Sequence, residues 1–348
     1  MTRAPFPLLF LLLATGLAAA CGGSHSPSGP DGTPTPAPGS PVSGFVFYDE
    51  NGNGLLDAGE TVRLPGVTVA IGSRTGQTTA GGRFTVDAVA PGPQSASVQP
   101  ATLPAYFAAG ASVTVAVPAS GDVAVPAVLA LGSGKTANFY LAFGDSITWG
   151  EGSSNLGGYR DPLVADLRAY WGKADIYNDG VPGTKSNKGE ARIAASLASR
   201  RPAYALILYG TNDYNDAECR NNPPCYTVEA LRSMIVQTRE AGAFPVLGTI
   251  PPVNPAYVDR GAEDRNYWVT SMNTFVRAMA AQERVALAEV HGDMLKQPSL
   301  SALFADDKHP NDAGYAVMEK SFFNAITRPV GATSSGRPRG FSFSLHGW

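Results

Sequence analysis

The sequence is poor in charged residues, histidine and cysteine, and the shortage of charge narrows what the protein can bind. Charged residues make up 16% of the 348 positions, the net charge is -3, and no block of Lys or Arg occurs. Binding of nucleic acid or of an anionic membrane surface through charge requires such a block, so we expect neither partner. The hydrophobic share of 44% is that of a soluble globular protein. The length allows two domains with linkers.

A long hydrophobic run is also missing. Leu8–Leu13 is an apolar run too short to span a bilayer. Arg3 precedes it and small residues lead to Cys21, so residues 1–20 are predicted to be a secretory signal peptide. The segment also resembles a bacterial lipoprotein signal, which implies an exported protein of the cell envelope whose Cys21 carries a lipid that tethers it to a membrane. Simple secretion after cleavage nearby is the alternative.

The two remaining cysteines, Cys219 and Cys225, enclose the loop-like segment Arg-Asn-Asn-Pro-Pro. An exported protein meets oxidising conditions, so one disulfide between them is expected. Two free buried thiols are the alternative. A metal site at this pair is not expected, because further ligands are lacking nearby.

Changes in composition divide the rest of the chain. Residues 21–41 are rich in Gly, Ser, Pro and Thr, which is typical of a disordered tether. Residues 42–131 hold short alternating segments separated by Gly and Pro, which indicate an all-β sandwich. A short Gly/Ser hinge is predicted at 132–137 and a disordered tail at 329–348.

The predicted sandwich contains a twelve-residue acidic loop, Asp49–Glu60, with the spacing of an EF-hand calcium loop. Together with the preceding G-x-V-F-x-D segment and a later TAGGRF, it resembles the calcium-binding B-repeats of serine-aspartate-repeat surface adhesins, which have a prealbumin-like fold. The alternative is an acidic turn without metal. The resemblance implies a structural Ca²⁺ held by Asp49, Asn51, Asn53, the Leu55 carbonyl, Asp57 and Glu60.

Residues 138–328 alternate between apolar strands and amphipathic helices. This pattern predicts an α/β domain with a flavodoxin-like parallel sheet and helices on both faces. One helix is indicated by apolar residues from Trp268 to Met279, with Phe275 on the same face, and another from about Ala313 to Ile326. The expected strands are Phe139–Phe143, Ala174–Asn178, Tyr204–Tyr209, Pro245–Ile250 and Val285–Val290.

A candidate nucleophile follows the first of these strands. Ser146 comes after an apolar run and a turn at Gly144, and ligands of open parallel sheets bind at such carboxyl ends. A helix-capping serine is the plain alternative. Three further segments end strands or lie near the C-terminus and carry matching chemistry: the Gly183 segment, GTND with Asn212, and DDKH with Asp306 and His309. Acyl transfer needs a hydroxyl, an imidazole base, a carboxylate that orients it and donors for the oxyanion.

These four blocks, in this order, resemble those of the SGNH (GDSL-type) hydrolases. The resemblance implies Ser146 as nucleophile, His309 as base and Asp306 as its orienting carboxylate. It also implies an oxyanion hole made by the Ser146 N–H, the Gly183 N–H and the Asn212 amide. Gly180 competes with Gly183 for this role, and Asp307 competes with Asp306.

We therefore expect a serine esterase that needs no cofactor for catalysis and acts on a small-molecule or glycan ester, with short acyl groups such as acetyl on carbohydrate as the first expectation. A lysophospholipase or thioesterase for longer acyl chains is the second. A calcium-dependent adhesion protein with an inactive hydrolase fold is the alternative of another class. Trp149 and Tyr214 flank the site residues and either can contact substrate or pack. His291 is interpreted as a core or surface histidine. The oligomeric state does not follow from the sequence.

Overall fold

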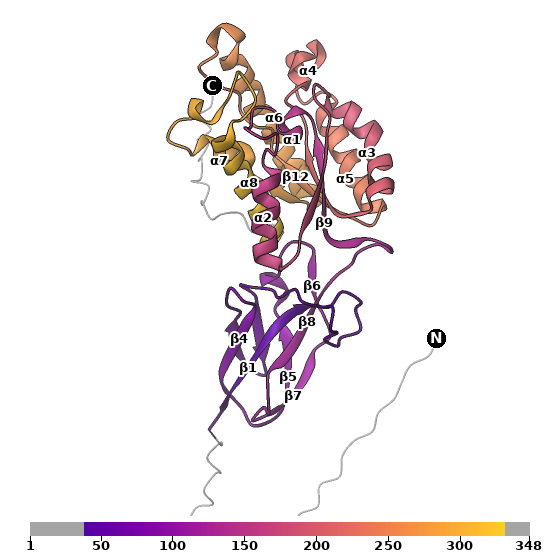
Figure 1. Ribbon diagram of the computed structural model, residues 1–348, viewed down its shortest axis with the longest axis vertical. Helices are drawn as coiled ribbons and strands as arrows, with labels where there is room; N and C mark the ends of the chain where they lie inside the picture. Colours follow the sequence, from indigo (N-terminus) through magenta and orange to yellow (C-terminus); the bar gives the residue numbers. More distant parts are fainter. Residues whose placement is uncertain (1–37, 331–348) are drawn as a thin grey trace, which may run out of the picture. The chain divides into compact units, whose positions relative to one another are not determined.

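A computed structural model describes residues 38–330 of the chain (Figure 1), and these residues fall within one compact unit. The predicted signal peptide, the lipidation site Cys21, the tether up to residue 37 and the tail from residue 331 lie outside the described residues. No helix within 38–330 has both the length and the apolar character needed to cross a membrane.

The N-terminal part of the described chain consists of two four-stranded sheets. In the first, β1 pairs with β8 in parallel, and the other neighbours are antiparallel. The second sheet is antiparallel throughout. The first sheet runs in the order β4 (Arg83–Val89), β1 (Ser40–Tyr48), β8 (Val123–Leu129) and β6 (Phe107–Ala109), and the second in the order β3 (Arg74–Gln77), β2 (Thr68–Ile71), β5 (Gly92–Val98) and β7 (Val113–Val117). A short 3₁₀ helix, η1, covers Pro100–Thr102.

Alternation of apolar and polar residues explains why these segments form two-sided strands. In β4, Phe84 and Val86 are buried, while the alternating residues Arg83 and Thr85 are exposed. The same period of two places one face of each sheet in a shared apolar core. Burial of a single valine or phenylalanine side chain contributes about 1.5–3 kcal/mol to stability. This core therefore stabilises the β-rich region, and it supplies no catalytic group.

The second part of the chain is built on a five-stranded sheet in which all neighbours are parallel. The strand order, read from one edge, is second, first, third, fourth and fifth along this part of the chain, which is the flavodoxin-like order. The strands are β10 (Asp175–Gly180), β9 (Thr136–Gly144), β11 (Pro202–Leu208), β12 (Phe244–Gly248) and β13 (Ala286–Ala288).

Helices cover both faces of this sheet, as Figure 1 shows for α3 and α5 on one side and α2 and α8 on the other. Successive residues of β9 point to opposite faces: Tyr140 joins the apolar cluster of α2 and α8, and Leu141 joins that of α3, α5 and α6. The helices are α1 (Ser146–Trp149), α2 (Arg160–Trp171), α3 (Ser186–Arg200), α4 (Ala217–Asn221), α5 (Thr227–Glu240), α6 (Ala262–Glu283), α7 (Val290–Leu295) and α8 (Asp312–Thr327), with 3₁₀ helices η2 (Asp213–Asn215), η3 (Val258–Arg260) and η4 (Ser301–Leu303).

Apolar contacts join the β-rich part to the α/β part. Phe107 of β6 stacks on Trp171 at the end of α2, with ring centroids 5.5 Å apart. Tyr106 stacks on Phe244 of β12 at 4.8 Å, and its hydroxyl accepts the N–H of Ala286 and donates to a backbone carbonyl of β12. The β-rich region is therefore packed against the α/β domain.

Several boundaries differ from those expected. β1 begins at Ser40, within the predicted tether, and β9 begins at Thr136, within the predicted hinge. The strand expected at 285–290 shrinks to the three residues of β13, and Val290 starts α7. A short apolar run does not distinguish a strand from a buried helix turn. On α6, Phe275 is 40% exposed, although it shares the spacing of its buried neighbours.

Candidate active site

Ser146 lies where β9 gives way to α1, at the carboxyl edge of the sheet. Asp145 caps the helix, because its Oδ1 accepts the N–H of Ile147 at 2.9 Å. Gly144 permits this turn: a Cβ atom there would lie 2.1 Å from Thr148 Oγ1 and 2.5 Å from the Leu208 carbonyl. β9 lies between β10 and β11, where the order of the sheet reverses. The serine thus begins a helix at the switch point of the sheet.

The structure brings Ser146, His309 and Asp306 together in a chain of hydrogen bonds. Ser146 Oγ lies 2.9 Å from His309 Nε2, and His309 Nδ1 lies 2.7 Å from Asp306 Oδ2. Asp306 Oδ1 also accepts the backbone N–H groups of Lys308 and His309, at 2.9 and 2.7 Å. The histidine is 4% exposed and the serine 4%. Nε2 is therefore in place to accept the hydroxyl proton, while the carboxylate holds the protonated Nδ1.

The pKa of Asp306 is lowered by these contacts. Partial burial acts to raise it, but the hydrogen bonds from the His309 ring and from the two backbone N–H groups outweigh burial and hold the pKa below its usual range. Its neighbour Asp307 pairs instead with Lys308 at 3.4 Å and Arg260 at 3.8 Å. Of the two carboxylates considered from the sequence, only Asp306 contacts the imidazole.

Two further loops, one with Gly183 and one with Asn212, lie at the carboxyl edge of the sheet. Val181 to Thr184 forms a turn closed by the Thr184 N–H and the Val181 carbonyl, and Gly183 takes the positive φ of 75° that the turn requires. The N–H of Gly180 is already donated to Asn178 Oδ1 at 3.0 Å. Gly183 is exposed, with open space around it. This geometry favours Gly183 over Gly180 as a donor to a bound oxyanion.

Asn212 follows β11 and links the loops of the site. Its Nδ2 lies 3.1 Å from the Thr184 carbonyl and 3.2 Å from Asp145 Oδ2. The side chain is 6% exposed. The first N–H groups of α1 have no partner within their own helix, so the helix start and the Gly183 turn present donors to one region. The Asn212 amide borders this region, but both of its N–H groups are engaged, and it donates to an oxyanion only in exchange for one of these contacts.

Ionisable side chains with little exposure to solvent, Asp145 and Arg192, lie next to the candidate nucleophile. Burial raises the pKa of Asp145 to about 7, helped by the nearby charge of Asp213, although the hydrogen bond from Ile147 acts the other way. Arg192 of α3 donates to the carbonyls of Gly144, the last residue of β9, and Asp179, the last but one of β10, at 3.1 and 2.6 Å. The guanidinium therefore joins the ends of two neighbouring strands, two residues before the candidate nucleophile on β9.

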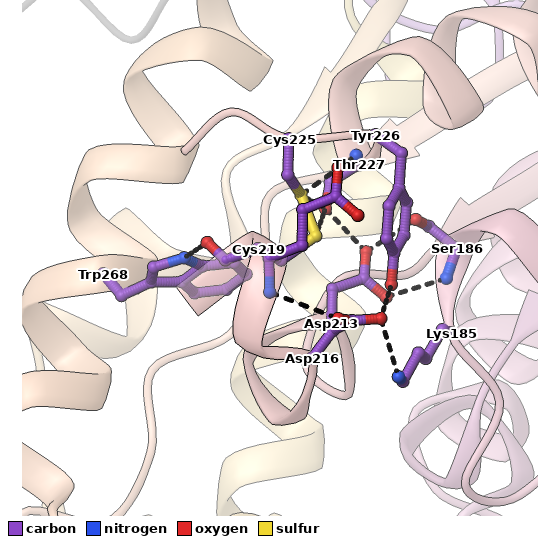
Figure 2. The surroundings of a disulfide bond; sticks show 10 residues. Lys185, Ser186, Asp213, Asp216, Cys219, Cys225, Tyr226, Thr227 and Trp268 are labelled. Carbon is purple, nitrogen blue, oxygen red and sulfur yellow. Dashed lines mark hydrogen bonds and ion pairs between the residues drawn. A yellow bond between two sulfur atoms is a disulfide. The ribbon is translucent and has the colours of Figure 1, made fainter. Parts of the chain in front are cut away.

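The predicted disulfide between Cys219 and Cys225 is present (Figure 2). Thr227 Oγ1 lies 3.1 Å from Cys225 Sγ and donates to Asp213 Oδ2 at 2.7 Å, and the same carboxylate accepts the N–H and hydroxyl of Ser186 at 2.9 and 2.6 Å. Burial raises the pKa of Asp213, against the effect of these donors. The disulfide loop is thus connected to the residue next to Asn212.

Sequence reasoning missed three residues that position the site: Arg192, Tyr315 and Glu151. The Tyr315 hydroxyl of α8 donates to the carbonyls of Ile147 and Glu151, at 3.1 and 2.7 Å. Glu151 Oε2 lies 3.5 Å from His309 Nε2. Periodicity does not show such contacts between distant segments, although the two glycines that flank Glu151 mark an unusual turn.

The remaining candidates take other roles. His291 is 4% exposed, and burial together with the charge of Arg277 lowers its pKa to about 4. It is a core histidine, and Asp293 pairs with Lys296 and Ser321 instead. Tyr214 packs edge-on against Trp268, whereas Trp149 is 42% exposed.

The acidic loop of the β-rich part is held by hydrogen bonds between its own residues. The Asp49 carboxylate accepts the N–H groups of Gly52 and Gly54, and Glu60 accepts those of Glu50 and Asp57. The amide nitrogens of Asn51 and Asn53 are directed at Asp57 Oδ2, at 2.7 and 3.0 Å. Within residues 38–330, no three His, Cys, Asp or Glu side chains converge as a metal-binding group.

The α/β part of this chain is similar to known proteins. A family model described as the GDSL-like Lipase/Acylhydrolase family matches residues 142–317. Esterase TesA of Pseudomonas aeruginosa is 30% identical over 164 residues, which cover 46% of this chain and 74% of that protein. A lipase/acylhydrolase from Enterococcus faecalis is 23% identical with a TM-score of 0.46, over 55% of this chain and 95% of its own. A variant of an acetyl xylan esterase from Geobacillus stearothermophilus is 20% identical with a TM-score of 0.46, over 57% and 99%.

Proposed function

The chain belongs to the GDSL-like lipase/acylhydrolase family and is a carboxylic ester hydrolase, and we propose that it removes short acyl groups, such as acetyl groups on carbohydrate, through an acyl-enzyme on Ser146. The contact that carries this proposal is the 2.9 Å approach of Ser146 Oγ to His309 Nε2. The imidazole of His309 can accept the proton of the hydroxyl, and its other nitrogen, Nδ1, is already held by the Asp306 carboxylate.

In the first half of the reaction, Ser146 Oγ bonds to the ester carbonyl carbon while its proton passes to His309 Nε2. The carbonyl electron pair moves to oxygen, and the negative charge faces the Ser146 N–H, the Gly183 N–H and the Asn212 amide. The carbon–oxygen bond to the alcohol then breaks, and His309 returns the proton to the leaving oxygen. Asp306 keeps Nδ1 protonated and oriented throughout.

In the second half, water attacks the acyl carbon as His309 takes one of its protons. Collapse of this intermediate releases the acid and returns the proton to Ser146. The balance is one ester and one water consumed, and one alcohol and one acid produced. Besides the ester and water, the proposed cycle uses only protein side chains and backbone N–H groups.

A carbohydrate substrate is supported by Trp149. This residue is 42% exposed and lies three residues after the nucleophile, at the end of α1. Exposed aromatic rings offer a flat apolar face with a polar edge, and the face of a sugar ring is suited to such a surface. By contrast, Tyr214 is used in packing against Trp268.

The test is hydrolysis of p-nitrophenyl esters of increasing acyl length by residues 38–348, with Ser146→Ala as the control. We expect the highest kcat/KM on acetate and loss of turnover in the variant. A preference for long acyl chains would instead support a lysophospholipase or thioesterase. Absence of any Ser146-dependent hydrolysis would contradict the proposal. Neither the family match nor the relatives favour an inactive adhesion protein.

Calcium is proposed as a structural ion of the β-rich part. By type, the oxygens of Asp49, Asn51, Asn53, Leu55, Asp57 and Glu60 suit Ca²⁺, but Asn51 and Asn53 would have to turn their amide oxygens inward. We expect a higher melting temperature with calcium than with a chelator and unchanged turnover. The gain should disappear in Asp49→Asn and persist in Asp87→Asn, an exposed control on β4. Equal melting in both conditions would contradict this part.

Export and lipid anchoring are proposed from the signal-like segment before Cys21, and the Cys219–Cys225 disulfide supports an oxidising compartment. Expression of the full chain with a labelled fatty acid tests it. Label should enter the membrane fraction with the wild-type protein, and Cys21→Ser should abolish it. A released, unlabelled wild-type protein would favour simple secretion.

A further inference from the structure

Glu151 is the one acidic side chain besides Asp306 that contacts the catalytic imidazole within the described residues. Its Oε2 lies 3.5 Å from Nε2, the nitrogen that faces Ser146 Oγ. Asp306, in contrast, contacts Nδ1 on the far side of the ring. A carboxylate on the Nε2 side lies where the substrate must enter, because Nε2 delivers the proton to the leaving oxygen.

The backbone of Glu151 is fixed at this place. Its N–H donates to the Ser146 carbonyl at 3.0 Å, and its own carbonyl accepts the Tyr315 hydroxyl at 2.7 Å. Gly150 and Gly152 flank it with φ values of 99° and 93°. At Gly152 a Cβ atom would lie 2.5 Å from the Pro310 carbonyl and 3.0 Å from His309 Cβ. The turn that carries Glu151 therefore packs directly against the histidine segment.

The carboxylate is not neutralised by a neighbouring cation. Over residues 38–330, no Lys or Arg forms an ion pair with Glu151, and its side chain is 48% exposed. Before reaction, Nε2 accepts the hydrogen bond of the Ser146 hydroxyl, so the neutral imidazole has no proton on this nitrogen to donate to Glu151. The negative charge then faces the space that the alcohol part of the ester occupies.

We propose that Glu151 sets the charge preference of the site, so that esters with a negatively charged alcohol part are disfavoured and esters with a positively charged one are favoured. This inference rests on the proposed acyl-enzyme function. At a separation of about 6 Å in a half-exposed site, one elementary charge on the substrate changes the rate by about three- to tenfold. Added salt should reduce the effect, because the charges are open to solvent.

The test compares three acetate esters of similar shape: 3-acetoxybenzoate, 3-acetoxybenzamide and 3-acetoxy-N,N,N-trimethylanilinium. Their intrinsic reactivities differ, so the quantity of interest is each charged-to-neutral ratio of kcat/KM in Glu151→Gln divided by the same ratio in the wild type. We expect Glu151→Gln to raise the anionic ratio and lower the cationic one, each by about three- to tenfold, and Glu151→Lys to shift both further. Both shifts should shrink at about 0.5 M salt.

Glu240→Gln is the matched control, because Glu240 is an exposed carboxylate at the end of α5, which leads into the start of β12, away from the strand ends that carry the site. It changes the net charge equally and should leave both ratios unchanged. Ratios that stay constant in Glu151→Gln, with all three esters hydrolysed by the wild type, would overturn this inference and leave the esterase proposal standing. Failure of the wild type to hydrolyse any of the three acetates would overturn both.

Discussion

Asn212 Nδ2 lies 3.2 Å from Asp145 Oδ2, so the residue before the nucleophile is joined to the loop that follows β11. The same nitrogen lies 3.1 Å from the Thr184 carbonyl, next to Gly183. The three segments proposed to bind the oxyanion are thus held by one amide group, although they are far apart in the chain. An Asn212 N–H group that exchanges one of these acceptors for the oxyanion adds a donor to loops that are already in position.

Replacement of Asn212 by alanine should lower kcat on the order of a hundred- to a thousandfold, because one donor to the oxyanion is lost. KM for p-nitrophenyl acetate should change little, since the charge develops after binding. Steady-state kinetics with Asn222→Ala, an exposed asparagine in the disulfide loop, provides the comparison. A fall in kcat of less than about fivefold would remove Asn212 from the oxyanion hole.

Asp306→Asn should lower kcat by about four orders of magnitude, because an amide no longer selects the Nδ1-protonated imidazole. Asp307→Asn is the matched control, since this neighbouring carboxylate pairs with Lys308 and Arg260 and not with the histidine. Its kcat should stay within about threefold of the wild type. The opposite order of effects would transfer the orienting role to Asp307.

Asp145→Asn should change how stability depends on pH. In the folded protein the pKa of Asp145 is raised to about 7 from the usual 3.8. Between these values the folded state holds one more proton than the unfolded state, so this group lowers stability as pH rises from about 4 to 7. Asparagine keeps the helix cap without this proton. The stability of the variant relative to the wild type should therefore grow over this range, by at most about 4 kcal/mol.

Urea unfolding at several pH values measures that difference. Asp259→Asn, an exposed carboxylate of η3, should run parallel to the wild type over the same range. If the difference between Asp145→Asn and wild type is constant from pH 4 to 8, the burial of Asp145 does not shift its titration as described.

Removal of the disulfide by Cys219→Ala with Cys225→Ala should lower the free energy of unfolding by about 2 kcal/mol, as expected for a cross-link that closes a loop of this length. Turnover should also fall, because the loop supports Asp213 through Thr227. Thr227→Val separates the two effects, since it keeps the disulfide and removes the hydrogen bond to Asp213. Unchanged unfolding in both variants would show that neither contact contributes to stability.

The sequence predicted those helices and strands whose burial leaves a simple period in the chain. The strand before Ser146 and the helix after His309 appear in the structure close to where periodicity placed them, as β9 and α8. The reason is that burial on both faces of a strand, or on one face of a helix, leaves a direct pattern in the chain. The pairing of Cys219 with Cys225, which is present in the structure, was predicted from the expected export and from the count of cysteines.

Contacts between segments far apart in the chain could not be predicted from sequence periodicity. Nothing in the sequence singled out Glu151 or Arg192, and only the folded chain shows that one faces the imidazole and the other joins the ends of two strands. The choice between Gly180 and Gly183 likewise needed the hydrogen bond that occupies the Gly180 N–H. Each of these depends on a through-space distance that a period of 2 or 3.6 residues does not encode.

The hydroxyl of Ser146 and the imidazole of His309 are separated by 163 positions in the chain. The serine is synthesised early in the α/β domain, whereas its base precedes the last helix, α8, whose Tyr315 also secures the turn after the serine. A chain cut anywhere between them, or still emerging from the ribosome, has a nucleophile without a base. Ester hydrolysis that depends on this pair therefore begins only when the domain is complete.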